Sequence, residues 1–143
     1  MMIRRLLYVF FIFILGACSQ QEVEEKSPKT NYITLEDVET VITEQGFELE
    51  NKEIPSENFF IKELNKKTPE VYILEGHTLS VYVFPSETDR EKGVQRFEEI
   101  TAAAELVEHK VYEIRNILVF YVSNDEKVQN GLLEALRNLG VST

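Results

Sequence analysis

Several features that many proteins use for stability or catalysis are scarce in this chain. It has one cysteine, no tryptophan and two histidines among 143 residues. A single cysteine excludes an internal disulfide framework, so the fold depends on burial of apolar side chains. Positive charge is also scarce, because 15 Lys and Arg residues face 25 Asp and Glu residues and the formal net charge is −10. We therefore expect no nucleic-acid partner, since binding to phosphates needs a surplus of Lys and Arg.

The apolar run near the start of the chain is too short to cross a membrane. It comprises the ten residues from Leu6 through Leu15, whereas a membrane-spanning helix needs about 20. Arg4 and Arg5 precede the run, and the small residues Gly16 and Ala17 follow it. A basic start, an apolar middle and small residues form the three-part pattern of a secretory signal peptide. An uncleaved N-terminal anchor helix is the alternative.

The residues that end this run resemble the lipobox of bacterial lipoproteins. Leu15, Gly16, Ala17 and Cys18 match its four positions, and Cys18 is the only cysteine of the chain. The resemblance implies that the Cys18 thiol receives a covalent diacylglycerol and that a signal peptidase cuts between Ala17 and Cys18. No other cofactor is expected. The alternative is an ordinary secretory signal peptide with a cysteine nearby.

These features predict three parts of the chain. Residues 1–17 are the lipoprotein signal peptide, and residues 18–31 are a lipidated tether. The tether is expected to be flexible because it is polar, has almost no apolar residue and contains Pro28. Residues 32–143 are expected to form a single domain, because the length of this segment is typical of one domain.

Sequence motifs of common catalytic sites are absent. The chain has no G-x-S-x-G turn, no G-x-x-x-x-G-K phosphate loop and no G-x-G-x-x-G dinucleotide fingerprint. No serine lies in a recognisable activating context near His77 or His109. We therefore expect a protein that is not an enzyme and has no catalytic residue.

An alternative is an envelope enzyme or metal-binding lipoprotein that uses His77, His109 and nearby carboxylates. Glu105 and His109 have i, i+4 spacing, and Glu108 adjoins them, so one helical face could offer oxygen and nitrogen ligands. The H-E-x-x-H pattern is missing, and an acidic helix end exposed to solvent is the more common structure. We therefore expect no metal ligand.

The periodicity of the apolar residues predicts helices over 34–46, 86–104 and 124–139. Thr34 and Ser86 have the spacing of N-cap residues, and Gly46 and Gly140 suit helix ends. Strands are predicted at 47–50, 71–74, 79–84, 111–114 and 117–122, with turns over 75–78 and 115–116. Residues 51–68 have no clean period, and a short strand or a single turn is expected there.

The second half of the chain resembles itself at an offset of 38 residues. Val81 and Gly93 align with Val119 and Gly131 at this spacing. Two ββα units would build an α+β two-layer sandwich, in which an antiparallel sheet has its helices on one face. Chance similarity between two strand–helix segments is the alternative. The apolar run 117–122 predicts a central strand that is covered on both sides.

Tyr72, Tyr82, Tyr112 and Tyr121 all fall on predicted strands. The rings are expected to pack against neighbouring strands, because tyrosine suits half-buried sheet positions. The alternative is an exposed aromatic platform that binds a peptide or glycan.

Three segments of the predicted domain, residues 68–72, 81–86 and 115–121, resemble small lipoproteins of Gram-positive bacteria in overall pattern. The pattern covers roughly residues 45–140 and carries no known chemistry. It implies a domain anchored on the outer, extracytoplasmic face of the cell membrane. We expect this domain to bind another component of the envelope, with the membrane itself contacted through the lipid.

Overall fold

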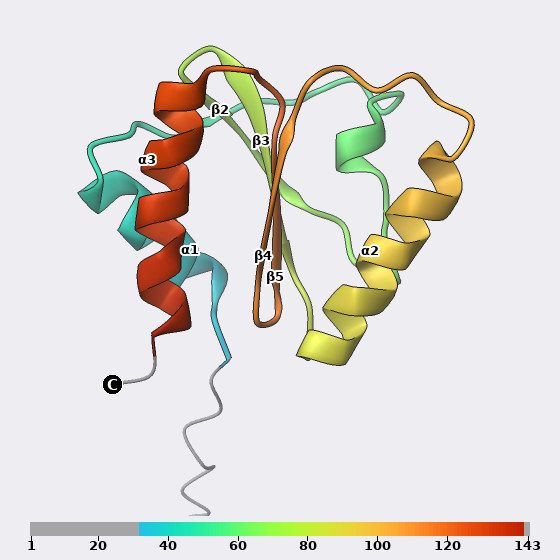
Figure 1. Ribbon diagram of the computed structural model, residues 1–143, viewed down its shortest axis with the longest axis horizontal. Coiled ribbons are helices and arrows are strands. Elements are labelled where there is room, and N and C mark those ends of the chain that lie inside the picture. The colour runs from blue at the N-terminus through green and yellow to red at the C-terminus, as the bar shows by residue number, and fades with distance from the viewer. Residues whose placement is uncertain (1–31, 142–143) are drawn as a thin grey trace, which may run out of the picture.

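The computed structural model describes residues 32–141, so the predicted lipobox and tether lie outside the described residues. The described residues form three α-helices and one five-stranded sheet (Figure 1). Neighbouring strands are all antiparallel, in the order β1-β2-β3-β5-β4. The α+β class and the antiparallel sheet are thereby confirmed. In chain order the elements are α1 (Leu35–Glu44), β1 (Glu50–Asn51), the 3₁₀ turn η1 (Phe59–Ile61), β2 (Glu70–Leu74), β3 (His77–Val83), α2 (Glu87–Thr101), β4 (Lys110–Ile114), β5 (Ile117–Tyr121), α3 (Glu126–Arg137) and the 3₁₀ turn η2 (Asn138–Gly140).

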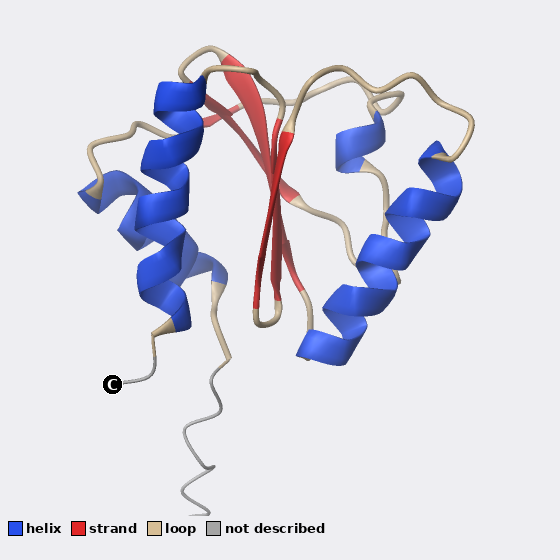
Figure 2. Cartoon of the chain, viewed as in Figure 1, coloured by secondary structure: helices blue, strands red, loops and turns tan. Residues whose placement is uncertain are grey.

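The helices lie on both faces of the sheet, so the prediction of two layers with helices on one face is wrong. Helices α1 and α3 cover one face, and α2 and η1 cover the other (Figure 2). The physical reason is the composition of the central strand β5, which is apolar on both sides. All five residues of β5 are buried, as the uninterrupted apolar run predicts. A single helical layer would leave one side of this strand exposed to water.

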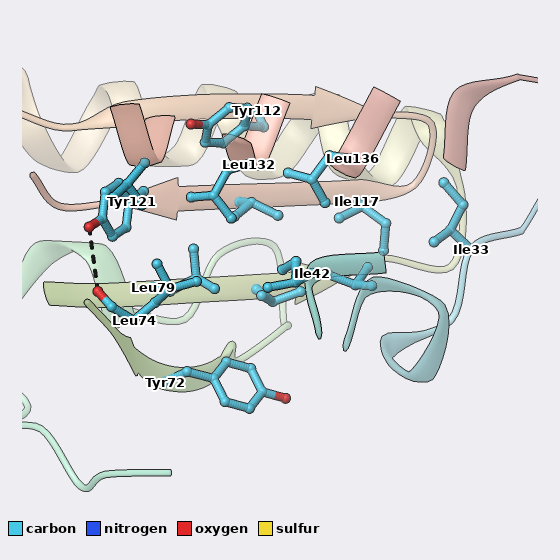
Figure 3. Packing of buried hydrophobic residues seen from close by; sticks show 14 residues of the cluster. Ile33, Ile42, Tyr72, Leu74, Leu79, Tyr112, Ile117, Tyr121, Leu132 and Leu136 are labelled. Carbon is cyan, nitrogen blue, oxygen red and sulfur yellow. Dashed lines mark hydrogen bonds between the residues drawn. The ribbon is translucent and has the colours of Figure 1, made fainter. Parts of the chain in front are cut away.

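Two apolar clusters therefore form the core, one on each side of the sheet. The α1/α3 cluster is the larger, and its side chains interleave between helices and strands (Figure 3). The α2 cluster is rich in aromatic rings, and its buried members are Phe60, Leu64, Tyr82, Phe84, Phe97, Leu118 and Phe120. Alternate residues of β3 and β5 contribute to the two clusters, because successive side chains of a strand point to opposite faces.

The helix starts follow from local capping. Thr34 caps α1 in a capping box with Asp37, and the Ser86 hydroxyl accepts a hydrogen bond from the Asp89 N–H at the start of α2. Both caps are as predicted. Helix α3 begins at Glu126, two residues after the predicted start at Asn124, because its N-cap is Asp125, whose carboxylate satisfies two orphan N–H groups of the first turn.

The two hairpins are related by an approximate two-fold axis. Val81 pairs directly with Val119 at the centre of the β3–β5 ladder, and Leu79 pairs with Tyr121. This is the register that an offset of 38 residues requires. However, a two-fold axis perpendicular to a sheet would place equivalent helices on the same face, whereas α2 and α3 lie on opposite faces. The predicted ββα repeat is therefore limited to the hairpins. The connections also differ, since residues 84–86 join β3 to α2 and the longer segment 122–125 joins β5 to α3.

The segment between α1 and β2 departs most from the prediction. Only Glu50 and Asn51 pair with β2, instead of residues 47–50. Phe47 and Leu49 pack against the α1/α3 cluster, which keeps that part of the chain out of the sheet. Residues 51–68 contain a single 3₁₀ turn, one of the two structures expected there.

Replacement of Gly93 by alanine is expected to destabilise the protein by about 1–3 kcal/mol through overpacking. Gly93 is buried on α2, and an added Cβ would overlap Cζ of the Phe84 ring and lie 2.8 Å from its Cε1. This clash outweighs the gain of about 1 kcal/mol in helix propensity. Urea unfolding of the variant would measure the change.

Gly131→Ala is the matched control, because its Cβ would also meet a phenylalanine ring, that of Phe47, at 2.7 Å. Phe47 is only half-buried and can turn aside, so this variant should lose less stability. The double variant Gly93→Ala/Phe84→Leu should recover part of the loss. Equal stability of Gly93→Ala and the parent chain would contradict the close packing of α2 on Phe84.

Candidate functional site

The two histidines lie on opposite faces of the sheet. His77 begins β3 and is exposed, with its ring edge-on to Tyr121 at a centroid distance of 6.1 Å. His109 is half-buried on the α2 side, where its ring centroid lies 4.7 Å from that of Phe60. Its Nδ1 lies 2.9 Å from the Val107 carbonyl oxygen. The structure therefore does not bring His77 and His109 into a common site.

The helical metal site weighed from the sequence rests on a helix that ends too early. Helix α2 ends at Thr101, so Glu105, Glu108 and His109 belong to an irregular connection and do not share a helical face. Over residues 32–141, no three His, Cys, Asp or Glu side chains are grouped so that they could hold one metal ion.

The strand tyrosines are structural, as predicted, because all four are buried. The Tyr82 hydroxyl donates to the carbonyl oxygens of Lys62 and Phe60 at 2.6 and 3.2 Å. The Tyr112 hydroxyl donates to the Gln129 carbonyl at 2.8 Å. Tyr72 is hydrogen-bonded to Glu39. These side chains tie the sheet to the elements that cover it and do not form an exposed platform.

Burial also changes the acidity of these hydroxyl groups. Desolvation raises the pKa of Tyr82 and Tyr112 well above the usual range of tyrosine. The pKa of Tyr72 is raised for the same reason, and the hydrogen bond and negative charge of Glu39 raise it further. The ionised form is thus unfavourable at these positions.

An apolar cleft lies between η1 and the connection from α2 to β4. We call it the η1 cleft. Its volume is about 260 Å³, and its lining residues are Glu57, Asn58, Phe59, Phe60, Glu105, Leu106, Val107 and Val122. Two of the large apolar side chains that remain exposed, Phe59 at 37% and Val107 at 62%, belong to this lining. Apolar surface beside the α2 cluster is therefore left exposed to water at this cleft.

The charged residues that line the η1 cleft are both acidic. They are Glu57 and Glu105, and both are exposed at its rim. The exposed Glu108 lies nearby in the same connection. Lys62 follows η1 in the chain and does not line the cleft, although its Nζ donates a hydrogen bond to the carbonyl of Ser56, the residue before Glu57. The charge of the lining residues themselves is therefore only negative, around an apolar interior.

The cleft lies at the end of the sheet opposite to the point where the chain enters the domain. The Ile33 N–H donates to Oδ1 of Asn116 at 2.9 Å, and Nδ2 of Asn116 donates back to the Ile33 carbonyl at 2.8 Å. Asn116 lies in the turn before β5, whereas Val122, in the cleft, directly follows β5. The intervening strand spans about 16 Å. Figure 1 shows the start of the described chain and the η1 turn at opposite ends of the strands.

A second, polar depression lies between the turn at Asn65–Lys66 and α2. Lys66, Lys92 and Arg96 contribute positive charge, but Glu63 and Glu99 also line it. Arg96 is paired with Glu99 at 3.3 Å. The charges are mixed in sign, so this depression shows no preference for an anion or a cation.

No sequence motif marks the η1 cleft. Its walls come from residues 57–60, 105–107 and 122, which are far apart in the chain. The one local signal is the apolar pair Leu106–Val107, which lies between Glu105 and Glu108 and outside any helical period.

No known protein-family model, characterised protein or solved structure matches this chain, so its geometry carries the functional argument. From Tyr32 to Val141 no helix has the length and apolar character that crossing a bilayer requires.

Proposed function

We propose that this chain is a lipoprotein held on the outer face of the cytoplasmic membrane, and that its α+β domain binds another envelope component without catalysing a reaction. The observation that carries the proposal is the sequence Leu15-Gly16-Ala17-Cys18, placed directly after a basic and then an apolar segment. Cys18 is the only thiol available for modification.

The strength of the anchor is compatible with an acidic protein. Each buried CH₂ group of an acyl chain contributes roughly 0.8 kcal/mol to membrane binding, and two chains give lasting attachment. The anchored chain would lose Arg4 and Arg5 with the signal peptide and carry a net charge of −12 (13 minus 25), but its repulsion from anionic head groups fades within a Debye length of about 10 Å. The favourable free energy of inserting the acyl chains therefore exceeds the electrostatic repulsion.

The arrangement of the domain supports a role in binding. The described chain begins beside Asn116, at the end of the sheet away from the η1 cleft. A chain anchored through Cys18 can thus present the cleft away from the bilayer. The thirteen residues from Ser19 to Asn31 could reach about 40 Å when fully stretched, enough to lift the domain clear of the head groups.

Replacement of Cys18 by serine is expected to abolish incorporation of labelled palmitate and to leave the chain as an uncleaved precursor or release it from the membrane. Serine keeps the size of the side chain but lacks the nucleophilic thiol. Palmitate labelling and membrane fractionation in cells that make the full chain would measure both effects.

Ser19→Ala is the matched control for this experiment, because it changes the next residue and leaves the four lipobox positions intact. Its labelling should equal that of the parent chain. Unchanged labelling of Cys18→Ser, or an intact Met1 in mass spectra of the native protein, would contradict the proposal.

A further inference from the structure

The η1 cleft has the size of a side-chain pocket. Its 260 Å³ lies below the roughly 300–1,000 Å³ of sites that enclose a small molecule. Phe59 and Val107 stand at its walls and remain exposed to water. Insertion of one bulky apolar side chain between them would remove this surface from water, which is favourable by about 25 cal/mol per Å² of apolar area.

The charge of the residues around the cleft determines which kind of polypeptide can supply that apolar side chain. Glu57 and Glu105 flank the opening, and no Lys or Arg is among the lining residues. A positively charged segment would be attracted to this rim and an acidic one repelled. A second copy of this chain is a poor occupant, because each copy carries the same acidic rim and a net charge of −10.

We propose that the η1 cleft binds a basic segment of another protein through one bulky apolar side chain, while neighbouring lysines or arginines pair with Glu57 and Glu105. This inference rests on the proposed function, because it specifies the partner of the anchored domain. Phe60 forms the base of the site, and it is held in place by rings of Phe97, Phe120 and His109 at centroid distances of 5.7, 5.6 and 4.7 Å. This packing preorganises the pocket, which limits the entropy lost on binding.

A phage-displayed library of random peptides, selected against the full chain in lipid nanodiscs, tests the proposal. The expected enriched peptides carry Leu, Ile, Met or Phe next to Lys or Arg. A synthetic copy of an enriched peptide should bind Val107→Ser and the double variant Glu57→Lys/Glu105→Lys about tenfold more weakly than the parent chain. All three positions are exposed, so the variants should remain folded.

Leu133→Ser is the matched control, because Leu133 is an exposed apolar residue on α3, on the other face of the sheet. It should leave peptide binding unchanged. Enrichment of acidic or uncharged peptides, no enrichment, concentration-dependent dimers that involve the cleft, or equal affinity of the charge-reversal variant would each overturn the inference.

The same experiment separates this inference from the proposed function. The Cys18→Ser chain, purified in detergent, should bind the enriched peptide as tightly as the parent, because Cys18 does not line the cleft. If the peptide binds but the parent chain is not labelled with palmitate, the binding site in the η1 cleft is supported and the proposed lipid anchor is contradicted. If the parent chain is labelled but no basic apolar peptides are selected, the lipid anchor is supported and the binding site is contradicted.

Discussion

Between pH 9 and pH 11 the free energy of unfolding is expected to fall by up to about 4 kcal/mol. The cause is the burial of Tyr72, Tyr82 and Tyr112, whose pKa values in the folded protein are raised above the ordinary value of about 10. Below pH 10 these tyrosines are neutral in both states, and their contribution to stability is fully present. Above pH 10 only the unfolded chain ionises them, so each favours unfolding by about 1.4 kcal/mol per pH unit.

Urea unfolding at a series of pH values would measure this slope, and tyrosinate absorbance would show that the protons are lost on unfolding. Tyr82→Phe is the informative variant, because it removes one of the three ionisations. The loss between pH 9 and pH 11 should then shrink by about 1.4 kcal/mol. Deprotonation of lysines affects the parent protein and the Tyr82→Phe variant alike. If the free energy of unfolding falls equally steeply with pH in both proteins, ionisation of buried tyrosine is not the cause of the loss.

Asn116→Ala is expected to destabilise the protein by about 3 kcal/mol. The Asn116 side chain is buried and makes three hydrogen bonds, to the N–H and carbonyl of Ile33 and to the Phe84 carbonyl at 3.1 Å. Alanine leaves these three backbone groups without the side-chain partner, and each unsatisfied buried group costs about 1–3 kcal/mol. The loss is less than additive, because water can reach groups near the turn. Thermal or urea unfolding would measure it.

Asn130→Ala, an exposed position on α3, should change stability by less than about 0.5 kcal/mol. Asn116→Asp gives a second test, because its carboxylate would face the carbonyl oxygens of Ile33 and Phe84. These dipoles raise the pKa of the introduced carboxyl, so the penalty should grow as the pH rises through 4. If the loss of stability in Asn116→Asp does not depend on pH, the Asn116 amide nitrogen does not face these two carbonyl oxygens.

The effect of Asn116 extends beyond stability in the proposed function. Asn116 holds Ile33, close to the start of the described chain, against the turn before β5. This contact sets the direction in which a lipid-anchored chain would leave the domain relative to the η1 cleft. Its loss would uncouple the orientation of the cleft from the anchor while leaving the cleft residues themselves unchanged.

Interactions between residues close in the chain were predictable from the sequence. Thr34 and Ser86 were recognised as caps because an N-cap depends on residues within one helical turn. The hairpin turn Arg115–Asn116 was predicted because two apolar strands flank a two-residue turn. The apolar run in β5 also indicates cover on both sides, which is incompatible with the predicted arrangement of helices on one face only.

The tertiary structure alone decided which face each helix covers, because both faces of β5 are apolar and the periodicity of a helix does not distinguish between them. It also decided the contacts of Asn116, whose side chain binds Ile33 from 83 residues away, and the existence of the η1 cleft, whose walls come from residues 57–60, 105–107 and 122. By itself the sequence determined the class of the fold, its hairpins and its caps, since each depends on neighbours in the chain. Long-range packing depends on the shapes of whole elements, and these exist only once the chain has folded.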